Sequence, residues 1–407
     1  MMKKLLMMMA FMAVFAMNGC GGGDDGGTPV TPVTPSEDSG SSDEKEKGDN
    51  PKDDDVPEVS VRLVGGDISL LPTYEEHGAR YYTTDGTAIS NVLDYLKGRG
   101  WNAMRVRLFV DPSKAPTEAR GQGVRQDLQY VIALCKRIKG AGMALLLDFH
   151  YSDTWADPSA QWTPLAWQNL NDTQLQAKIY EYTSDCLNQL NAAGATPDYI
   201  QTGNEISYGM LWGPTGSEGN RCYMGSEANW SRFAMLLKQA VKACRDQCPK
   251  AKVVLHTERV KQPAVMLNFY NQMSKLGVSY DVIGLSYYPY YHGNLNGLNS
   301  ALTQLESTYT DKRIMVVETG HSYAYEMGDE ATGYELSAEG QRRFTADLVK
   351  VLKQHDHVDG LFWWFPEANE YGLDWNTKRV TDNWYNASLF DNRTGRALPA
   401  VDELGGF

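Results

Sequence analysis

The sequence predicts an α/β protein in which a single (β/α)₈ TIM barrel follows a signal peptide and a disordered tether. Three observations predict the barrel: apolar runs of strand length recur eight times after residue 58, segments with helical spacing of apolar residues separate them, and no change of composition divides this region. Strands that alternate with helices form parallel sheets, and eight repeats in about 350 residues favour a closed barrel over an open sheet.

The first residues have the pattern of an export signal. Two lysines precede the apolar run Leu5–Met17, which is shorter than the roughly 20 residues that a membrane-spanning helix needs. The small Gly19 before Cys20 resembles the lipobox of bacterial lipoproteins, although Met stands where Leu is usual. That resemblance implies a lipoprotein signal peptide over residues 1–19 and lipidation of Cys20. An ordinary signal peptide followed by a chance cysteine is the alternative.

Residues 20–57 are rich in Gly, Pro, Ser and acidic side chains, and they include the repeat TPVTPVTP. Such a composition buries too little apolar surface to fold, so we expect a disordered tether. The acidic residues just after Cys20 resemble export signals of surface-displayed lipoproteins of some Gram-negative bacteria. We therefore expect an outer-membrane lipoprotein at the cell surface, with a periplasm-facing lipoprotein less favoured. The alternative for this segment is a solvated spacer that contains no sorting signal.

Composition excludes several classes of protein. The net charge of −13 argues against an electrostatic nucleic-acid binder, which needs a basic face. No second segment approaches 20 apolar residues, so we expect contact with a membrane through the N-terminal lipid anchor only. The chain contains 10 Trp and 23 Tyr residues. Aromatic faces suit flat, uncharged ligands such as sugar rings, although most aromatic residues are simply core.

The repeating elements of residues 58–407 follow a regular order. Leu128, Val131 and Cys135 have the spacing of an apolar helix face. This expected helix ends at Lys139-Gly140-Ala141-Gly142, and glycine is the usual residue at a helix C-terminus. The expected strands are Val61–Val64, Ala103–Phe109, Ala144–Phe149, Asp198–Thr202, Lys252–His256, Tyr280–Ser286, Arg313–Val317 and Val358–Trp364.

Cysteine usage adds little to this interpretation. Five cysteines follow Cys20, an odd number, and no His or Cys set has the spacing of zinc ligands. Cys244 and Cys248 lie four residues apart on one expected helix, which is poor geometry for a disulfide bond.

Functional residues of a (β/α)₈ barrel lie at the carboxyl ends of its strands. Two glutamates occupy such positions, Glu205 after the fourth strand and Glu318 after the seventh, so a closed ring allows them to face each other. Paired carboxyls with aromatic residues and no metal set are typical of glycoside hydrolysis, in which one carboxyl is protonated and the other ionised. Solvated residues at strand ends are the alternative.

Longer motifs resemble those of the family 53 endo-β-1,4-galactanases, also called arabinogalactan endo-β-1,4-galactanases. They are DFHYSDTWADP at 148–158, GNEISYGMLW at 203–212 and GLSYYPYY at 284–291, with further similarity at 100–112 and in VVET at 316–319. The resemblance covers the chain from about residue 65. It implies a retaining (β/α)₈ glycosidase that cuts internal β-1,4 bonds of galactan by a two-carboxylate double displacement and needs no cofactor for its chemistry.

The resemblance also implies roles for individual residues. Glu205 matches the acid/base and Glu318 the nucleophile, while Asn204 would hold the sugar 2-hydroxyl. Arg105 matches an arginine that keeps the nucleophile ionised, and Tyr287 a tyrosine that donates to it. The remaining expected substrate contacts are Arg107, His150, Asp153, Trp155 and Trp364. Arg107 is equally well explained as a structural ion-pair partner. For Trp364, a packed residue at the barrel end is the less favoured alternative.

The sequence departs from the family pattern at Gly320-His321-Ser322 and at Trp364-Phe365-Pro366-Glu367, so the loops that shape the outer subsites differ. Bacterial members of the family often hold a structural calcium ion between the loops that follow the last two strands. Calcium needs six or more oxygen ligands, and no EF-hand-like run is present. The weak candidate ligands are Asp329, Glu330, Glu370 and Asp374.

Two other functions stay open from the sequence. One is a related retaining hydrolase that acts on mannan or glucan, against which the DTWADP segment argues. The other is a non-catalytic surface lipoprotein that binds glycans, which the presence of both glutamates disfavours. For the leading interpretation we expect a polysaccharide as partner, no nucleic acid, and a monomer.

Overall fold

Eight parallel strands close into a barrel in the computed structural model, which describes residues 61–407 except 121, 325–330, 375 and 382–383. The order around the barrel is β1-β10-β9-β8-β7-β6-β5-β4, and a separate hairpin pairs β2 with β3. This closure confirms the predicted (β/α)₈ barrel. The barrel strands are β1 (Leu63–Asp67), β4 (Ala103–Leu108), β5 (Ala144–Phe149), β6 (Tyr199–Thr202), β7 (Lys252–Thr257), β8 (Val282–Tyr287), β9 (Arg313–Thr319) and β10 (Val358–Trp364), and the hairpin strands are β2 (Tyr81–Tyr82) and β3 (Ala88–Ile89).

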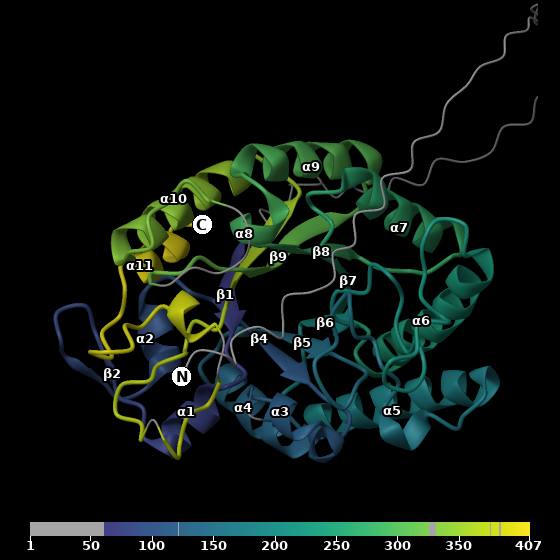
Figure 1. Cartoon of the computed structure of the whole chain (residues 1–407), viewed down its shortest axis with the longest axis horizontal. Coiled ribbons are helices and arrows are strands. Elements are labelled where there is room, and N and C mark those ends of the chain that lie inside the picture. Colours follow the sequence, from purple (N-terminus) through teal and green to yellow (C-terminus); the bar gives the residue numbers. More distant parts are fainter. Residues whose placement is uncertain (1–60, 121, 325–330, 375, 382–383) are drawn as a thin grey trace, which may run out of the picture. The chain divides into compact units, whose positions relative to one another are not determined.

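Helices surround the strands, as Figure 1 shows. Their apolar stripes face the sheet; in α4, for example, Val131, Leu134, Cys135 and Ile138 are buried at helical spacing. The α-helices are α1 (Leu71–His77), α2 (Val92–Gly98), α3 (Thr117–Arg120), α4 (Leu128–Gly140), α5 (Asp172–Ala192), α6 (Glu227–Gln247), α7 (Pro263–Lys275), α8 (Pro289–His292), α9 (Leu295–Thr308), α10 (Ala338–Leu352) and α11 (Ala400–Gly405). Short 3₁₀ turns lie at Pro112–Lys114, Leu165–Trp167 and Tyr385–Ala387.

The first strand differs from its predicted position. We expected Val61–Val64, whereas β1 spans Leu63–Asp67 and Val61 is 76% exposed. The apolar run stops at Val64 because two glycines follow it, yet those glycines continue the strand. A Cβ atom on Gly65 would lie 2.3 Å from the carbonyl oxygen of Ala103, so only glycine fits where β1 meets its neighbour.

The barrel interior has an apolar end and a polar end. Buried side chains from seven strands fill the end near the strand starts: Leu63, Ala103, Leu146, Val254, Val282, Met315, Val317 and Phe362. Side chains alternate along a strand, so the inward positions that follow on β4 and β5 are Arg105, Arg107 and Asp148. Polar side chains therefore gather toward the carboxyl ends of the strands, where active sites of this fold lie.

A β-bulge in β9 sets the direction of Glu318. The register with β8 steps from Leu285↔Val316 to Ser286↔Glu318, and the register with β10 shifts over the same residues. Two consecutive side chains thus face inward, Val317 in the apolar layer and Glu318 in the polar one. Simple alternation along β9 could not place both inside the barrel, so the bulge is what re-aims the glutamate.

The described part of the chain contains five cysteines, all buried and unpaired: Cys135, Cys186, Cys222, Cys244 and Cys248. Its helices include none that is long and apolar enough to cross a bilayer. The predicted signal peptide over 1–19, Cys20 and the predicted tether over 20–57 lie outside the described residues, so they stay predictions.

We expect Gly65→Ala to lower the free energy of unfolding by about 1–3 kcal/mol, because its methyl group would collide with rigid backbone at Ala103. Gly140→Ala is the matched control: this residue ends α4, and a Cβ atom there meets nothing within 4 Å. The control should be neutral or stabilising by up to about 1 kcal/mol. Urea unfolding of both variants measures the difference, and equal stabilities would contradict the close approach of β1 and β4.

Candidate active site

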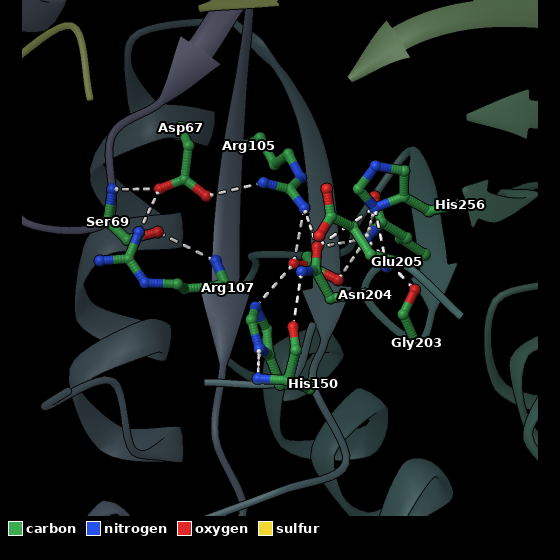
Figure 2. A network of polar contacts seen from close by, with 12 residues as sticks. Asp67, Ser69, Arg105, Arg107, His150, Gly203, Asn204, Glu205 and His256 are labelled. Atoms are coloured by element: carbon green, nitrogen blue, oxygen red, sulfur yellow. Dashed lines mark hydrogen bonds and ion pairs between the residues drawn. The ribbon is translucent and has the colours of Figure 1, made fainter. Parts of the chain in front are cut away.

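The site is organised around Arg105, which projects from β4 and is fully buried. Its Nη1 donates to Asp67 Oδ2 at 3.1 Å, and its Nη2 donates to Asp148 Oδ2 at 2.7 Å and to Asn204 Oδ1 at 2.8 Å. Nη2 also lies 2.9 Å from Glu318 Oε1. Figure 2 shows the guanidinium between Asp67 on one side and Asn204 on the other. Burial opposes the charge of Arg105, but Asp148, Glu318 and Asp67 outweigh it and raise the pKa of the guanidinium.

Arg107, two residues further along β4, shares Asp67 with Arg105. Its Nη1 donates to Asp67 Oδ1 at 2.7 Å, so each carboxylate oxygen of Asp67 faces one arginine. Aromatic rings enclose the Arg107 guanidinium, whose carbon lies 4.6 Å from the ring centre of Trp155 and 5.4 Å from that of Trp364. Both arginines point into the barrel as predicted, and the structural ion pair considered for Arg107 is formed.

The two glutamates meet at the side chain of Ser286. Ser286 Oγ lies 2.6 Å from Glu205 Oε1, to which it donates, and 3.4 Å from Glu318 Oε2. These two carboxyl oxygens are therefore at most about 6 Å apart, less than the roughly 6.5–9.5 Å typical of inverting glycosidases. Glu205 follows β6 with a left-handed φ of 47°, and Glu318 is 5% exposed in β9. The expected pairing of the two glutamates is thus present.

The two carboxyls have different electrostatic surroundings. Burial raises the pKa of Glu205 well above its ordinary value, and the nearby Glu318 and Glu258 raise it further. Burial also raises the pKa of Glu318, to about 7, but there Arg105 and the hydroxyl of Tyr288 oppose the shift. When one proton is available to the pair, it therefore resides on Glu205. The arrangement supplies one acidic and one ionised carboxyl in the same cavity.

The prediction that Tyr287 donates to Glu318 is wrong, because this contact is made by the next residue. Tyr288 Oη donates to Glu318 Oε2 at 3.1 Å, whereas Tyr287 Oη donates to the carbonyl oxygen of Gly293 at 2.9 Å. Alternation along β8 explains the difference. Ser286 faces the barrel interior and Tyr288 continues on that side, so Tyr287 must point outward, where its ring stacks on Phe344.

His150 and Asp153 are engaged inside the protein. His150 Nε2 lies 3.1 Å from Asp148 Oδ2, and its Nδ1 accepts the backbone N–H of Ala156 at 3.1 Å. The oxygens of Asp153 accept the backbone N–H groups of Asp111 at 3.1 Å and Leu165 at 2.8 Å. These contacts shape the loop after β5 that flanks Asn204. Their predicted contacts with substrate stay predictions.

The other predicted site residues lie around the same cavity. Asn204 donates from Nδ2 to the carbonyl oxygen of Ala156 at 2.9 Å, so its amide orientation is fixed. Trp155 meets Trp364 edge-to-face at a centroid distance of 6.0 Å, and Trp364 is 8% exposed at the end of β10. Their positions beside Arg107 are compatible with an aromatic surface for a sugar ring, and this role stays a prediction.

Sequence reasoning missed several residues of this network: Asp67, Asp148, His256, Glu258, Ser286 and Tyr288. Two of them carried a usable signal, because Asp67 and Asp148 are charged residues in otherwise apolar strands and such residues are rarely buried unless paired. Ser286 and Tyr288 had no comparable signal, since neither type is unusual at a strand end.

Among the described residues, the candidate calcium ligands do not form a metal site. Asp329 and Glu330 lie outside the described residues. Asp374 is exposed, and its carboxylate accepts from the backbone N–H of Asn376 at 3.1 Å and from Thr377 Oγ1 at 2.6 Å, as in a turn. Within residues 61–407, apart from the gaps given above, no three His, Cys, Asp or Glu side chains gather as a metal site would require.

A further buried carboxyl, Glu367, joins the loops that follow β1 and β10. Its Oε1 accepts the backbone N–H of Leu70 at 2.7 Å, and its carbonyl oxygen accepts from Tyr81 Oη at 2.8 Å. Burial, reinforced by the charge of Asp67, raises the pKa of Glu367 to about 8. The side chain is therefore neutral in the folded protein at neutral pH.

A (β/α)₈ barrel with two juxtaposed carboxyls at the carboxyl ends of its strands is the arrangement of a glycoside hydrolase. Comparison with known families makes this assignment specific. The chain belongs to glycosyl hydrolase family 53, whose family model matches residues 63–404.

Individual relatives agree with this assignment. The chain is 30% identical to an endo-β-1,4-galactanase of Bacillus subtilis (strain 168), over 83% of this chain and 84% of that protein. It is 33% identical to an arabinogalactan endo-β-1,4-galactanase of Thermothelomyces thermophilus, over 74% and 88% of the two chains. Among solved structures, the Ignisphaera aggregans GH53 catalytic domain matches with a TM-score of 0.74 at 35% identity, covering 86% of this chain and 97% of that one.

We expect Glu367→Gln to stabilise the protein in a pH-dependent way. The folded-state pKa of Glu367 is raised to about 8, so its contribution to stability is complete below the unfolded pKa and is lost as pH rises through 8. Glutamine keeps the acceptor for Leu70 without ionising. The stability of the variant relative to wild type should therefore rise between about pH 4.5 and 8, by on the order of a few kcal/mol, and level off above.

Urea unfolding at a series of pH values measures this difference. The exposed Glu76→Gln is the control for the loss of one carboxyl, and we expect it to change stability by less than about 0.5 kcal/mol. A constant difference between Glu367→Gln and wild type from pH 4 to 9 would contradict the protonated state of Glu367.

Proposed function

We propose that this protein is an endo-acting, retaining glycosidase that hydrolyses internal β-1,4-galactosidic bonds of galactan and arabinogalactan. The observation that carries the retaining mechanism is the separation of at most about 6 Å between Glu205 Oε1 and Glu318 Oε2, since retaining enzymes hold their carboxyls about 5–5.5 Å apart. The names of the relatives support the substrate, because two of them are called endo-β-1,4-galactanases.

In the first step, Glu318 attacks the anomeric carbon while Glu205 donates its proton to the departing sugar oxygen. Glu318 is suited to attack because Arg105 and Tyr288 favour its ionised form. Glu205 is suited to donate because burial and the neighbouring carboxylates hold its proton. The products are a glycosyl ester on Glu318 and a free galactan chain end.

In the second step, water displaces Glu318 from the ester, and Glu205 removes a proton from that water. Esterification removes the charge of Glu318, which was one of the causes that raise the pKa of Glu205. The pKa of Glu205 therefore falls, and the residue that served as an acid becomes an effective base. Two inversions at the anomeric carbon give net retention.

Mannan and glucan are the competing substrates, and binding of glycan without cleavage is the competing function. We expect measurable release of reducing ends from linear β-1,4-galactan and much slower release from mannan and glucan. Equal turnover of galactan and mannan would refute the specificity. An inactive wild-type protein that still binds galactan would support the non-catalytic alternative instead.

We also propose that the enzyme is a lipoprotein tethered at the outer surface of a Gram-negative cell. The lipobox-like sequence before Cys20 and the acidic residues that follow it support this proposal. Full-length protein expressed in such a cell should incorporate labelled palmitate, whereas Cys20→Ala should not. Cleavage of the tether by protease added to intact cells would separate surface display from a periplasm-facing anchor.

We expect Glu318→Ala to lower kcat on galactan by at least about 1,000-fold and Glu205→Ala by about 100- to 10,000-fold. Reducing-end assays on galactan measure both losses. Glu367→Gln is the control, because it alters another buried glutamate that does not contact the pair, and it should keep wild-type turnover near pH 6.

Azide distinguishes the two roles with an activated aryl galactoside. It should give an α-galactosyl azide with Glu318→Ala and a β-galactosyl azide with Glu205→Ala, since it replaces the nucleophile in the first and attacks the ester in the second. Full activity of either variant, or the reverse stereochemistry, would overturn the assigned roles.

The neighbouring tyrosines offer a matched pair of variants. Tyr288→Phe removes a hydrogen bond to Glu318, and we expect kcat/KM to fall by about 10- to 100-fold. Tyr287→Phe removes a hydrogen bond to the carbonyl oxygen of Gly293 and should change kcat/KM by less than about threefold. Steady-state kinetics on galactan decide the matter, and a larger loss for Tyr287→Phe would contradict the observed geometry.

A further inference from the structure

Ser286 occupies a central position among the charged groups, although its own side chain is neutral. It is fully buried near the end of β8, and its hydroxyl lies within reach of both catalytic carboxyls. On its other side, Ser286 Oγ lies 2.9 Å from His256 Nε2, which comes from the neighbouring strand β7. A hydroxyl has a single proton, so its direction matters for the two glutamates.

The partners of His256 determine where that proton points. The backbone N–H of Glu205 lies 3.2 Å and the side-chain Nε2 of Gln201 lies 3.1 Å from His256 Nδ1, and both groups can only donate. Asn204 Oδ1 also lies 3.1 Å from Nδ1, but this oxygen already accepts from Arg105 Nη2 at 2.8 Å. Nδ1 therefore carries no proton in the neutral ring. Burial and the charge of Arg105 lower the pKa of His256 well below its ordinary value, so the ring is neutral. Its proton is on Nε2 and is donated to Ser286 Oγ, which leaves the serine proton for a carboxylate.

Of the two carboxyl groups, Glu205 is the nearer acceptor. Ser286 Oγ lies 2.6 Å from Glu205 Oε1, a short distance for a hydrogen bond from a hydroxyl, and 3.4 Å from Glu318 Oε2. His256, Ser286 and Glu205 thus form a directed chain of hydrogen bonds. Figure 2 shows His256 beside Glu205, at the end of the network opposite Asp67.

We propose that Ser286, held by His256, is a positioning residue that directs its hydroxyl proton to Oε1 of Glu205. This contact confines the acidic proton of Glu205 to Oε2 in the first step and stabilises the ionised carboxylate in the second. The proposal rests on the acid/base role assigned to Glu205 in the proposed function. His256 acts through Ser286 and fixes the direction of the hydrogen bond.

Charged groups from several elements face Glu205 and raise its pKa, which the hydrogen bond from Ser286 lowers. Glu318 from β9, Glu258 after β7 and Asp157 after β5 all favour the protonated form of Glu205. Glu258 is partly neutralised by Arg259, whose Nε lies 2.6 Å from its Oε1.

Other polar groups of the site contact Glu318 instead of Glu205. Arg105 faces Glu318 and Asp148 rather than Glu205, and Tyr288 donates to Glu318. The hydrogen bond from Ser286 favours the ionised form of Glu205, against burial and the neighbouring carboxylates. Without it, we expect the carboxyl to hold its proton too strongly to serve as a base.

The test compares Ser286→Ala with wild type over a range of pH. Removing a hydrogen bond to the ionised form raises the pKa of Glu205, by about one to two pH units. The basic limb of kcat/KM on galactan, where Glu205 must be protonated, should therefore move to higher pH. The acidic limb of kcat on a dinitrophenyl galactobioside, whose slow step needs ionised Glu205, should move in the same direction.

Ser388→Ala is the matched control. Ser388 is equally buried, but its Oγ donates to the carbonyl oxygen of Phe390 at 2.7 Å. Its loss should move neither limb by more than about 0.2 pH units. A merely structural role of Ser286 would lower activity at every pH without moving the limbs, and that result would overturn the proposal. Ser286→Thr keeps the hydroxyl and should restore the wild-type limbs.

A measurement that does not depend on activity completes the test. The pKa of Glu205 can be followed by NMR of ¹³C-labelled glutamate carboxyls, with the signal assigned by its absence in Glu205→Gln. We expect a rise of at least about one unit in Ser286→Ala. If the protein had no galactanase activity but this rise in pKa was observed, the proposed function would be refuted, whereas the hydrogen bond from Ser286 to Glu205 would still be supported.

His256→Gln tests whether the histidine acts through the serine. In the wild-type background it should raise the pKa of Glu205, whereas in Ser286→Ala the same change should have a much smaller effect. Equal and additive shifts in the two backgrounds would show that His256 acts on Glu205 directly and would overturn this part of the proposal.

Discussion

The buried guanidinium of Arg105 is the constraint on which the rest of the site depends. An unpaired charge inside the barrel would be strongly destabilising, so the surrounding strands must supply acceptors. Asp67 from β1, Asp148 from β5, Asn204 after β6 and Glu318 from β9 do so. Because those elements come from distant parts of the chain, the contacts form only when the barrel is closed. The same interactions that satisfy Arg105 therefore assemble the residues of the candidate active site.

The layered interior explains why this network lies at one end of the barrel. Apolar side chains, among them Leu146, Met315 and Phe362, fill the end near the strand starts and keep water out beneath the polar layer. Above them, the charges of Arg105 and Arg107 face more carboxyls than they can neutralise. Glu205 adds another buried carboxyl to this site, and burial and the neighbouring carboxylates favour its protonated form. An excess of buried acids over arginines thus favours one protonated carboxyl in the site.

Unequal surroundings distinguish the two glutamates, which are chemically identical as residues. Glu318 has Arg105 and Tyr288 as partners, whereas Glu205 faces further carboxylates and is favoured in its ionised form by the Ser286 hydroxyl. The difference between the pKa values of the two carboxyls is therefore set by neighbours on other strands. In the double displacement proposed above, formation of the ester would remove the charge of Glu318 and so lower the pKa of Glu205.

The sequence by itself determined the class of fold and the two glutamates that face each other in the candidate site. Strands that alternate with helices predict a parallel sheet, because parallel strands need crossover connections, and eight such repeats predict that the sheet closes into a barrel. Glu205 and Glu318 lie where two of these strands end. The spacing of Arg105 and Arg107 placed both inside the barrel, because alternation along a regular strand has a period of two.

Only the tertiary structure decided the contacts within the site. The bulge in β9 that turns Glu318 inward depends on the register with both neighbouring strands, which no local pattern encodes. The choice of Tyr288 over Tyr287 depends on which side of β8 faces the interior. Asp67 and Ser286 acquire their roles from partners far away in sequence. Local sequence fixes which residues can lie on a strand face, whereas closure of the barrel fixes which of them meet.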